Sequence, residues 1–433
     1  MKYKEPRNKN YCGTIVEIKT LIPLENMNNV IHAIIMGNKV IVSKDVKVGD
    51  VGIYFPVETQ LSEIYLKINN LYRKKELNSD NTQKGFFEEN GRIKCIKFQR
   101  IFNSEGLFMP ISSISEFIEK GDKINIGDEF DELNGTPICN KYVIKYHNTP
   151  EISGSKNKGK EKLKKVSKLI EGQFAFHQDT SMLYKNLHRI KPDTLISITY
   201  KLHGTSSISS NLLCKKQLTL VEKILKKLNV NIVDTQYDNL FASRKVLKNS
   251  DLNPNAIHYY GEDIWGFANS ELKEFLQDGL TFYFEIVGFL PNGGYIQKDF
   301  DYGCEYGKHD NYIYRITYTN HKGKVFEFSG KQVQEYCKSN GLTAVPELYY
   351  GYAKDILNVS YDERDFEEKF LARIKELYNE KDCYICKNIV PEEGCVIRIE
   401  GLDFEAYKSK SVRFYEKETK DLDNGEANIQ DNQ

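Results

Sequence analysis

The sequence predicts an α+β protein in which a β-barrel is followed by a larger domain of antiparallel sheets flanked by helices. Short β-rich runs separated by glycine-containing turns fill the first third of the chain. The remainder mixes similar runs with segments whose apolar residues recur at helical spacing. At 433 residues the chain is long enough for two or three domains, each with its own core.

The N-terminal domain is expected to span residues 1–150 and to form an OB-like barrel. Gly37-Asn38 and Gly49-Asp50 mark two of its turns. About five short strands suit a barrel of this type. The candidate strands are Tyr11 to Leu24, Val30 to Met36, Lys39 to Ser43, Val51 to Phe55 and Arg92 to Ile101.

The last of these runs interleaves basic with apolar residues. Because the whole chain has no net charge, nucleic acid would have to bind to a local basic patch. A lysine-rich segment at 151–170 is expected to link the domains; such a run is usually just solvated, although it could also follow a phosphate backbone. The predicted nucleic-acid-binding residues are Arg92, Lys94, Lys97 and Arg100.

The larger domain is expected at residues 171–415. Its clearest helices are Asp365 to Tyr378, whose apolar residues share one stripe, and Lys331 to Asn340, which Gly341 ends. Leu218 to Val230 is also expected to be helical, as an insertion. Residues 416–433 are polar and acidic and are expected to form a disordered tail.

The first chemically informative segment is Lys201-Leu-His-Gly-Thr-Ser206, directly after a strand-like run at 194–200. A strand that delivers a lysine into a tight turn can present it as a covalent nucleophile. Taken alone, the pattern is equally consistent with a strand that ends in a polar turn, with Gly204 at a positive φ. The segments that follow favour the first interpretation.

Three later segments place charged residues on strands. The run 281–288 alternates as a strand does and carries Glu285 within an aromatic context. Glu393 stands at the start of a second strand, directly before Gly394. In the third segment, a period of two places two cations on the same strand face, which packing does not explain. These cations are Lys408 and Lys410.

In this order, the segments resemble motifs I, III, IV and V of the lysine-adenylating nucleotidyl transferases, the superfamily of ATP-dependent DNA ligases, RNA ligases and messenger-RNA capping enzymes. The K-x-H-G-T-S form resembles the RNA ligase 2-like branch, some members of which carry an N-terminal OB-type domain. DNA ligases and capping enzymes more typically have K-x-D-G, with arginine at the position of Ser206. The resemblance covers roughly residues 171–415.

Two further segments fit the same resemblance. Phe241-Ala-Ser-Arg244 resembles the Ser-Arg motif that follows the nucleophile. Tyr312-Ile-Tyr314-Arg-Ile lies where the family has an aromatic motif that ends in Phe-Asp, but Arg315 replaces the acid.

The resemblance implies a role for each residue. Lys201 would attack the α-phosphate of ATP, and Lys408 and Lys410 would favour the neutral amine and stabilise charge on the phosphate, since a free lysine has a pKa of about 10.4. Glu393 would bind Mg²⁺ or Mn²⁺. Glu285 would hold the ribose, and either Tyr312 or Tyr314 would stack on adenine. The other implied nucleotide contacts are His203, Gly204, Ser206, Arg244 and Arg398.

The expected function is that of an ATP-dependent RNA ligase that joins 3′-OH and 5′-phosphate ends in RNA repair. A lysyl-AMP and an adenylated 5′ end would be the intermediates, and the RNA would be a nicked duplex bound by a monomeric protein. Three alternatives stay open: a capping-type guanylyltransferase, a DNA ligase that uses the same lysine, and a non-catalytic nucleic-acid-binding protein.

Composition agrees with an expected cytoplasmic location. Hydrophobic residues make up 40% and charged residues 28%, which is typical of a soluble globular protein. No run approaches the ~18 apolar residues of a membrane span, and the N-terminus lacks the apolar core of a signal peptide, so no membrane is expected as a partner. Nine scattered cysteines, an odd number, favour reduced thiols.

Overall fold

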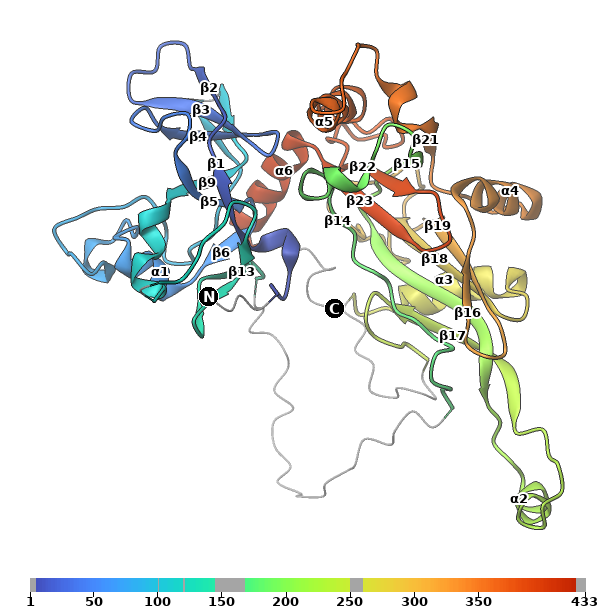
Figure 1. Ribbon diagram of the computed structural model, residues 1–433. Helices are drawn as coiled ribbons and strands as arrows, with labels where there is room; N and C mark the ends of the chain where they lie inside the picture. Colours follow the sequence, from blue (N-terminus) through green and yellow to red (C-terminus); the bar gives the residue numbers. More distant parts are fainter. Residues whose placement is uncertain (1–4, 100, 120, 145–167, 250–259, 426–433) are drawn as a thin grey trace.

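The computed structural model shows an α+β protein built mostly from antiparallel sheets flanked by helices, as the sequence predicts (Figure 1). It describes residues 5–99, 101–119, 121–144, 168–249 and 260–425. An N-terminal region, residues 5–144, lies beside a C-terminal region, residues 168–425, with one helix between them (Figure 1). Most of the lysine-rich linker lies outside the described residues, as do Arg100 and residues 426–433.

The N-terminal region contains two main antiparallel sheets. One has the strand order β10-β1-β5-β9, and the other has the order β2-β3-β4. The predicted strand from Tyr11 to Leu24 is divided in two at Ile18, whose backbone bonds to the turn at 49–50 instead. The strands are β1 (Gly13–Glu17), β2 (Thr20–Pro23), β3 (Val30–Ile35), β4 (Asn38–Ser43), β5 (Val51–Pro56), β9 (Gly106–Pro110) and β10 (Glu129–Phe130).

The ladders of these described strands do not close into a barrel. The two sheets approach at one edge, where the backbone N–H of Glu105 donates to the carbonyl of Lys39 at 2.8 Å. The predicted strand from Arg92 to Ile101 is reduced to a three-residue strand in a short hairpin. The smaller elements are β6 (Thr59–Leu61), α1 (Glu63–Ile68), β7 (Ile96–Phe98), β8 (Phe102–Ser104), β11 (Glu132–Leu133), β12 (Thr136–Pro137) and β13 (Cys139–Lys141).

The C-terminal region is formed around two five-stranded sheets. The first has the order β14-β23-β22-β15-β21 and the second the order β17-β16-β18-β19-β20. Every pairing is antiparallel except that of β14 with β23. The strands are β14 (Ser181–Met182), β15 (Leu195–Tyr200), β16 (Thr205–Lys215), β17 (Thr235–Ser243), β18 (Leu280–Gly288), β19 (His309–Thr319), β20 (Val325–Glu327), β21 (Glu347–Tyr352), β22 (Gly394–Ile399) and β23 (Glu405–Lys410).

The chain passes from the first of these sheets to the second through residues 201–204, between β15 and β16. The predicted alternation of β18 is confirmed, because Phe282, Phe284 and Ile286 are buried in one core cluster while Glu285 faces a cavity. The chain segment with the candidate nucleophile is therefore the connection between the two sheets.

Helices cover the outer faces of the sheets. The helix α4 (Gly330–Asn340) begins with a capping box between Ser329 and Gln332 and ends at Gly341, which has a φ of 67°. The helix α5 (Phe366–Tyr378) buries the predicted apolar stripe. The helix α3 (Ile264–Leu272) also packs into a core cluster, whereas α2 (Leu220–Lys227) covers no sheet and connects β16 to β17. Within the described ranges, no helix is both long and apolar enough to cross a membrane.

The prediction of a disordered tail at 416–433 is wrong for residues 416–423, which belong to a helix. Ser411 caps the helix α6 (Val412–Asp423), which lies between the two regions of the protein (Figure 1). Phe414 and Thr419 are buried, and the Thr419 hydroxyl accepts a hydrogen bond from the backbone N–H of Cys95 at 3.2 Å. The polar residues of this helix are ordered because they bind to other parts of the chain.

Candidate active site

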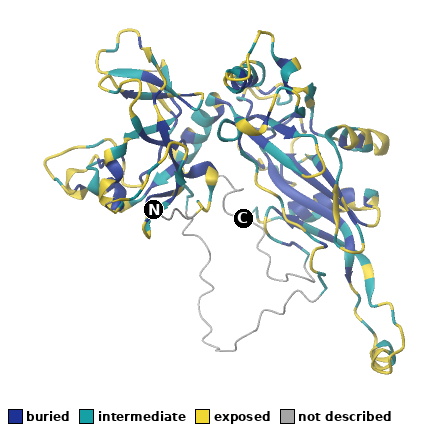
Figure 2. Ribbon diagram, in the orientation of Figure 1, coloured by how far each residue is buried: buried dark blue, intermediate teal, exposed yellow. Residues whose placement is uncertain are grey.

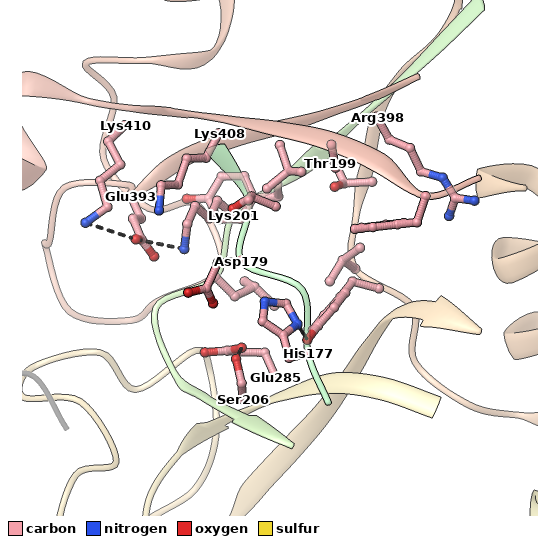
Figure 3. Close-up of a pocket in the computed structure, with 18 of the residues that line it drawn as sticks. His177, Asp179, Thr199, Lys201, Ser206, Glu285, Glu393, Arg398, Lys408 and Lys410 are labelled. Carbon is pink, nitrogen blue, oxygen red and sulfur yellow. Dashed lines mark hydrogen bonds and ion pairs between the residues drawn. The ribbon is translucent and has the colours of Figure 1, made fainter. Parts of the chain in front are cut away.

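Lys201 stands where the two sheets of the C-terminal region meet (Figure 3). Its backbone N–H donates to the carbonyl of Gly394 at 2.9 Å, which fixes the end of β15 against the start of β22. Its Nζ lies 2.8 Å from Oε1 of Glu393, and the Nζ of Lys410 lies 3.5 Å from the same oxygen. One carboxylate thus lies between two lysines.

The pairing of β22 with β23 produces this cluster. Gly394 is opposite Lys410, and Val396 is opposite Lys408. Both lysines line the same cavity, so the predicted common face is confirmed. Gly394 has a φ of 130°, and a Cβ at this position would lie 2.0 Å from the carbonyl oxygen of Ser409. Only glycine allows the two strands to approach this closely beside Glu393.

Burial and neighbouring charges shift the pKa values in this cluster in opposite directions. Burial, together with the positive charges of Lys410 and Lys201, lowers the pKa of Lys408 to about 7. Burial would raise the pKa of Glu393, but Lys201 and Lys410 outweigh this effect and hold the pKa at about 2. Glu393 is therefore ionised at neutral pH, and Lys408 gains or loses its proton in the neutral pH range.

Glu285 organises the turn that follows the lysine. Its Oε1 accepts a hydrogen bond from the Gly204 N–H at 3.1 Å, and its Oε2 accepts one from the Ser206 hydroxyl at 3.0 Å. Burial raises the pKa of Glu285 to about 7, although Lys201 opposes this shift. Gly204 does not have the positive φ that a strand ending in a simple polar turn would give it. Glycine is needed because a Cβ would lie 2.2 Å from the carbonyl oxygen of Ile286.

A cavity of about 1640 Å³, including its open mouth, surrounds these groups. It is lined by residues of both regions of the protein, including Asn10 and Lys141 from the N-terminal region. The structure brings together nine of the predicted site residues in this cavity. They are Lys201, Ser206, Arg244, Glu285, Tyr314, Glu393, Arg398, Lys408 and Lys410.

Three predicted nucleotide contacts lie outside the lining of this cavity, namely His203, Gly204 and Tyr312. His203 packs edge-on against the rings of Phe300 and Phe414, and its Nδ1 is 3.8 Å from Glu393. Burial lowers the pKa of His203 to about 4, so the imidazole is neutral. Tyr312 packs against an adjacent hydrophobic cluster. Of the two tyrosines considered for stacking on adenine, only Tyr314 faces the cavity.

Arg315, which replaces the acid of the family motif, forms a buried ion pair with Glu327. Its guanidinium also lies over the ring of Tyr283 at 4.5 Å. Arg398 lies nearby and donates from Nη2 to the carbonyl of Phe328 at 2.5 Å. Within the described part of the chain, the buried Nε and Nη1 of Arg398 have no hydrogen-bond partner.

The sequence did not point to a chain segment that crosses the cavity before β14. His177 Nδ1 lies 2.9 Å from the hydroxyl of Tyr314, and Asp179 accepts hydrogen bonds from Arg244 at 2.9 and 2.6 Å. Burial lowers the pKa of His177 to about 3. The segment has no regular periodicity, so no sequence signal could have identified it.

Glu418 of α6 was also missed, because it lies in the predicted tail. Its Oε2 is 3.3 Å from the Nζ of Lys410, so this lysine is held between Glu418 and Glu393. A signal was present in the sequence. Ser411 is a good N-cap, and Phe414 and Tyr415 lie one turn before Glu418 and Thr419.

The predicted nucleic-acid-binding run is largely covered by α6. Arg92 is buried, with Nε and Nη2 bonded to Glu58 at 2.9 and 2.6 Å, and its guanidinium is not accessible to a phosphate. Lys94 pairs with Asp423 at 2.8 Å, and Lys97 lies 3.8 Å from Glu416. Arg100 is outside the described residues. The acidic residues of α6 thus neutralise much of this run.

Glu393 fits a divalent cation site. Its Oε2 is buried and has no hydrogen-bond partner within the described ranges, although the carboxylate is ionised. Among the described residues, no group of three or more potential ligands could hold a metal ion by itself. A cation at Glu393 would therefore need oxygen ligands from a bound phosphate, which is usual for Mg²⁺.

Replacing Lys408 with alanine should weaken ATP binding and reduce its pH dependence. Because the pKa of Lys408 is about 7, the lysine is charged below this pH and becomes neutral above it. A polyanion binds best to the charged form, so the affinity should fall by up to about tenfold per pH unit above about pH 7. Isothermal titration of Lys201→Met protein, which lacks the candidate nucleophile, measures this dependence. Because the positive charge of Lys201 is missing in this protein, the pKa of Lys408 is higher there and the fall in affinity should begin at a higher pH.

The Lys201→Met/Lys408→Ala variant should bind ATP more weakly at low pH, with a flatter profile. Lys201→Met/Lys408→Arg is the control, because arginine stays charged throughout the range. Glu285 also titrates near pH 7 and is present in all three proteins. Identical pH profiles with and without Lys408 would contradict its assigned electrostatic role.

Comparisons with known proteins identify similar structures but no similar sequences. No protein-family profile matches the chain, and no curated protein matches it. Among solved structures, the RNA ligase of Naegleria gruberi with pyrophosphate is 17% identical, with a TM-score of 0.57. That match covers 95% of this chain and 99% of the ligase.

Two variants of the same Naegleria gruberi ligase give similar results. An apo variant has a TM-score of 0.58 at 16% identity, and a variant with ATP and Mn has a TM-score of 0.55 at 16% identity. Each match covers 96% of this chain and 100% of the ligase. The chain described here therefore has the fold of these RNA ligases over nearly its whole length.

Proposed function

We propose that this protein is an ATP-dependent RNA ligase that joins 3′-OH and 5′-phosphate ends. The observation that carries the proposal is the position of Lys201, which is 2.8 Å from an ionised Glu393 in a cavity shared with Lys408 and Lys410. A covalent nucleophile needs cations close to the phosphate that it attacks, and this cavity supplies them.

In the first step, the Nζ of Lys201 attacks the α-phosphorus of ATP. A phosphorus–nitrogen bond forms, the bond to the β-phosphate oxygen breaks, and pyrophosphate leaves. The ammonium group of Lys201 loses two of its three protons to solvent in this step, one before the attack and one as the phosphorus–nitrogen bond forms, and the third stays on the nitrogen. Lys408 and Lys410 lie on one strand face of the cavity and would stabilise the negative charge that develops on the phosphate.

The next two steps transfer AMP from the lysine to the RNA and then release it. An oxygen of the RNA 5′-phosphate displaces Lys201 from phosphorus, which gives an adenylated 5′ end. The 3′-OH then attacks the phosphorus of that end, forms the phosphodiester and releases AMP. The lysine is free for a new cycle after the second step.

Glu393 is the residue of this chain that would hold Mg²⁺ or Mn²⁺, together with phosphate oxygens. Such a cation supplies charge neutralisation for the phosphates. The ion pair between Lys201 and Glu393 keeps the nucleophile in position before the nucleotide binds.

The nucleoside would occupy the part of the cavity between the two sheets. Glu285 would accept hydrogen bonds from ribose hydroxyls and Tyr314 would stack on adenine; both side chains line the cavity. Ser206 and Arg244 would contact the ribose or a phosphate, and Arg398 has buried donors for the same ligand.

The choice of RNA rests on two supports. The K-x-H-G-T-S form of the lysine motif resembles that of RNA ligases, and the similar solved structures are of RNA ligases. We further propose a nicked duplex as the substrate, held in part by the N-terminal region, with a monomeric protein acting in RNA repair in the cytoplasm.

The test is a sealing assay with matched nicked duplexes. A 5′-phosphorylated RNA nick should be joined in the presence of ATP and magnesium, and the same nick with a 5′-OH should not. An all-DNA nick joined at the same rate would indicate a DNA ligase. Covalent labelling by GTP in preference to ATP would indicate a capping-type guanylyltransferase. No labelling by either nucleotide would overturn the proposal.

A further inference from the structure

The helix α2 stands at the tip of a long hairpin, away from the candidate active site. The strands β16 and β17 continue beyond the sheet, and α2 connects them at the far end (Figure 1). None of its residues is buried, and the whole tip is exposed or half-buried (Figure 2). The ligase reaction proposed above uses no part of it.

This helix has two distinct faces. At 100° per residue its aliphatic side chains share one face, while its lysines lie on the other. Four of the aliphatic side chains are between 58% and 78% exposed. These are Leu220, Val221, Ile224 and Leu228, and the exposed Val230 and Val233 follow them in the chain.

Local interactions stabilise the helix without help from the rest of the protein. Thr219 and Glu222 form a capping box at its start. Lys216 pairs with Glu222 at 2.8 Å, and Lys226 pairs with Asp234 at 2.5 Å. The apolar face is thus presented to solvent by an ordered helix, none of whose residues belongs to a hydrophobic core cluster of the described part of the chain.

The tip is also basic, although the whole protein has no net charge. Residues 215–234 contain five lysines and two acidic residues. Lys223 and Lys227 border the apolar face on the wheel, and neither has an ion-pair partner among the described residues. An apolar stripe with lysines along one edge matches the chemistry of an anionic lipid surface, where the stems of lysine extend toward the headgroups.

We propose that α2 binds the surface of an anionic membrane, with its apolar face among the acyl chains and its lysines at the headgroups. A specific protein interface generally uses about 20–30 residues a side, whereas this tip offers six exposed aliphatic residues. A bilayer requires no shape complementarity and accepts so small a surface. The long hairpin would hold the rest of the protein away from the membrane.

Sedimentation of the full-length protein with lipid vesicles tests this proposal. The vesicles consist of phosphatidylcholine alone or of equal parts of phosphatidylcholine and phosphatidylserine. The wild-type protein should sediment with the anionic vesicles and less with the neutral ones, and added salt should weaken binding. The Leu220→Asp/Ile224→Asp variant should bind at least about tenfold more weakly.

Two further variants complete the experiment. Lys223→Glu/Lys227→Glu should lose most of the preference for anionic vesicles. Val48→Asp/Ile126→Asp is the matched control, because these aliphatic side chains are similarly exposed but lie in the N-terminal region. It should bind as the wild type does. Covalent labelling by ATP confirms that each variant is folded, since no α2 residue lies in the cavity.

Three results would overturn the proposal. If the wild-type protein stays in solution with both kinds of vesicle, the apolar face of α2 does not bind lipid. A groove on a protein partner would then be the surface that covers it. Equal binding to neutral and anionic vesicles would remove the role of the lysines. Unchanged binding by the Leu220→Asp/Ile224→Asp variant would place lipid binding elsewhere on the molecule.

Discussion

Replacing Lys201 with alanine is expected to abolish the covalent attachment of AMP to the protein, with a loss of roughly 10³-fold or more in labelling rate. The reason is chemical, because no other group in the cluster lies at the end of β15, where the adduct would form. Lys408 and Lys410 come from β23 and would contact the phosphates from another side. Labelling with α-labelled ATP, followed by denaturing electrophoresis, measures the effect.

The same variant should still join RNA whose 5′ end is already adenylated. That last step needs no lysyl adduct, so retained activity would separate loss of the nucleophile from loss of folding. Lys354→Ala, which removes an exposed lysine paired with Asp193, is the control and should label at the wild-type rate. A Lys201→Ala protein that labels as rapidly as the wild type would contradict the assignment.

Replacing Arg92 with alanine is expected to lower the free energy of unfolding by about 3–5 kcal/mol. The side chains of Arg92 and Glu58 are 1% and 4% exposed, so the variant leaves a carboxylate buried without its main partner. Arg92 also bonds to Asp423 at 3.1 Å, which ties α6 to the N-terminal region. Chemical denaturation followed by tryptophan fluorescence and circular dichroism measures the loss.

This loss should depend on pH. Burial raises the pKa of Glu58 to about 7 even with Arg92 present, and the pKa should rise further without it. A raised carboxyl pKa means that the folded state binds the extra proton, so stability is lost as the pH increases through this range. The effect of Arg92→Ala should therefore be smaller at about pH 6 than at about pH 8.

Two variants serve as controls for this prediction. Arg73→Ala breaks an exposed pair with Glu88 and should cost at most about 1 kcal/mol. The Arg92→Met/Glu58→Met protein should recover much of the stability, because neither charge stays buried. A loss below about 1 kcal/mol for Arg92→Ala would show that the pair does not hold α6 in place.

The motif residues could be predicted from the sequence because strands place alternate residues on one face. This alternation correctly predicted that Lys408 and Lys410 lie on one side of β23. It also predicted that Glu285 lies on the side of β18 opposite its apolar face. The helix α4 could also be predicted from the sequence, since Gly341 marks its end. Local patterns of this kind depend on residues that are close in the chain. They therefore predict the same strand or helix in any tertiary structure that buries one face of that element.

Contacts between distant segments could not be predicted in this way. Arg92 was interpreted as an exposed base, but its partners are Glu58, on a neighbouring turn, and Asp423, at the other end of the chain. The polar composition of α6 suggested disorder, although Glu418 reaches Lys410 in the cavity. The amino-acid composition gives the number of charged groups, but which of them form ion pairs depends on the tertiary structure.

The central claim is that one amine, that of Lys201, carries AMP. The most direct measurement is to incubate the wild-type protein with ATP and magnesium, digest it and locate the adenylate by mass spectrometry. The adduct should be found on the peptide that contains Lys201, through a phosphorus–nitrogen bond that acid cleaves and alkali does not. An adduct on Lys408, on Lys410 or on any other residue, with Lys201 unmodified, would contradict the account.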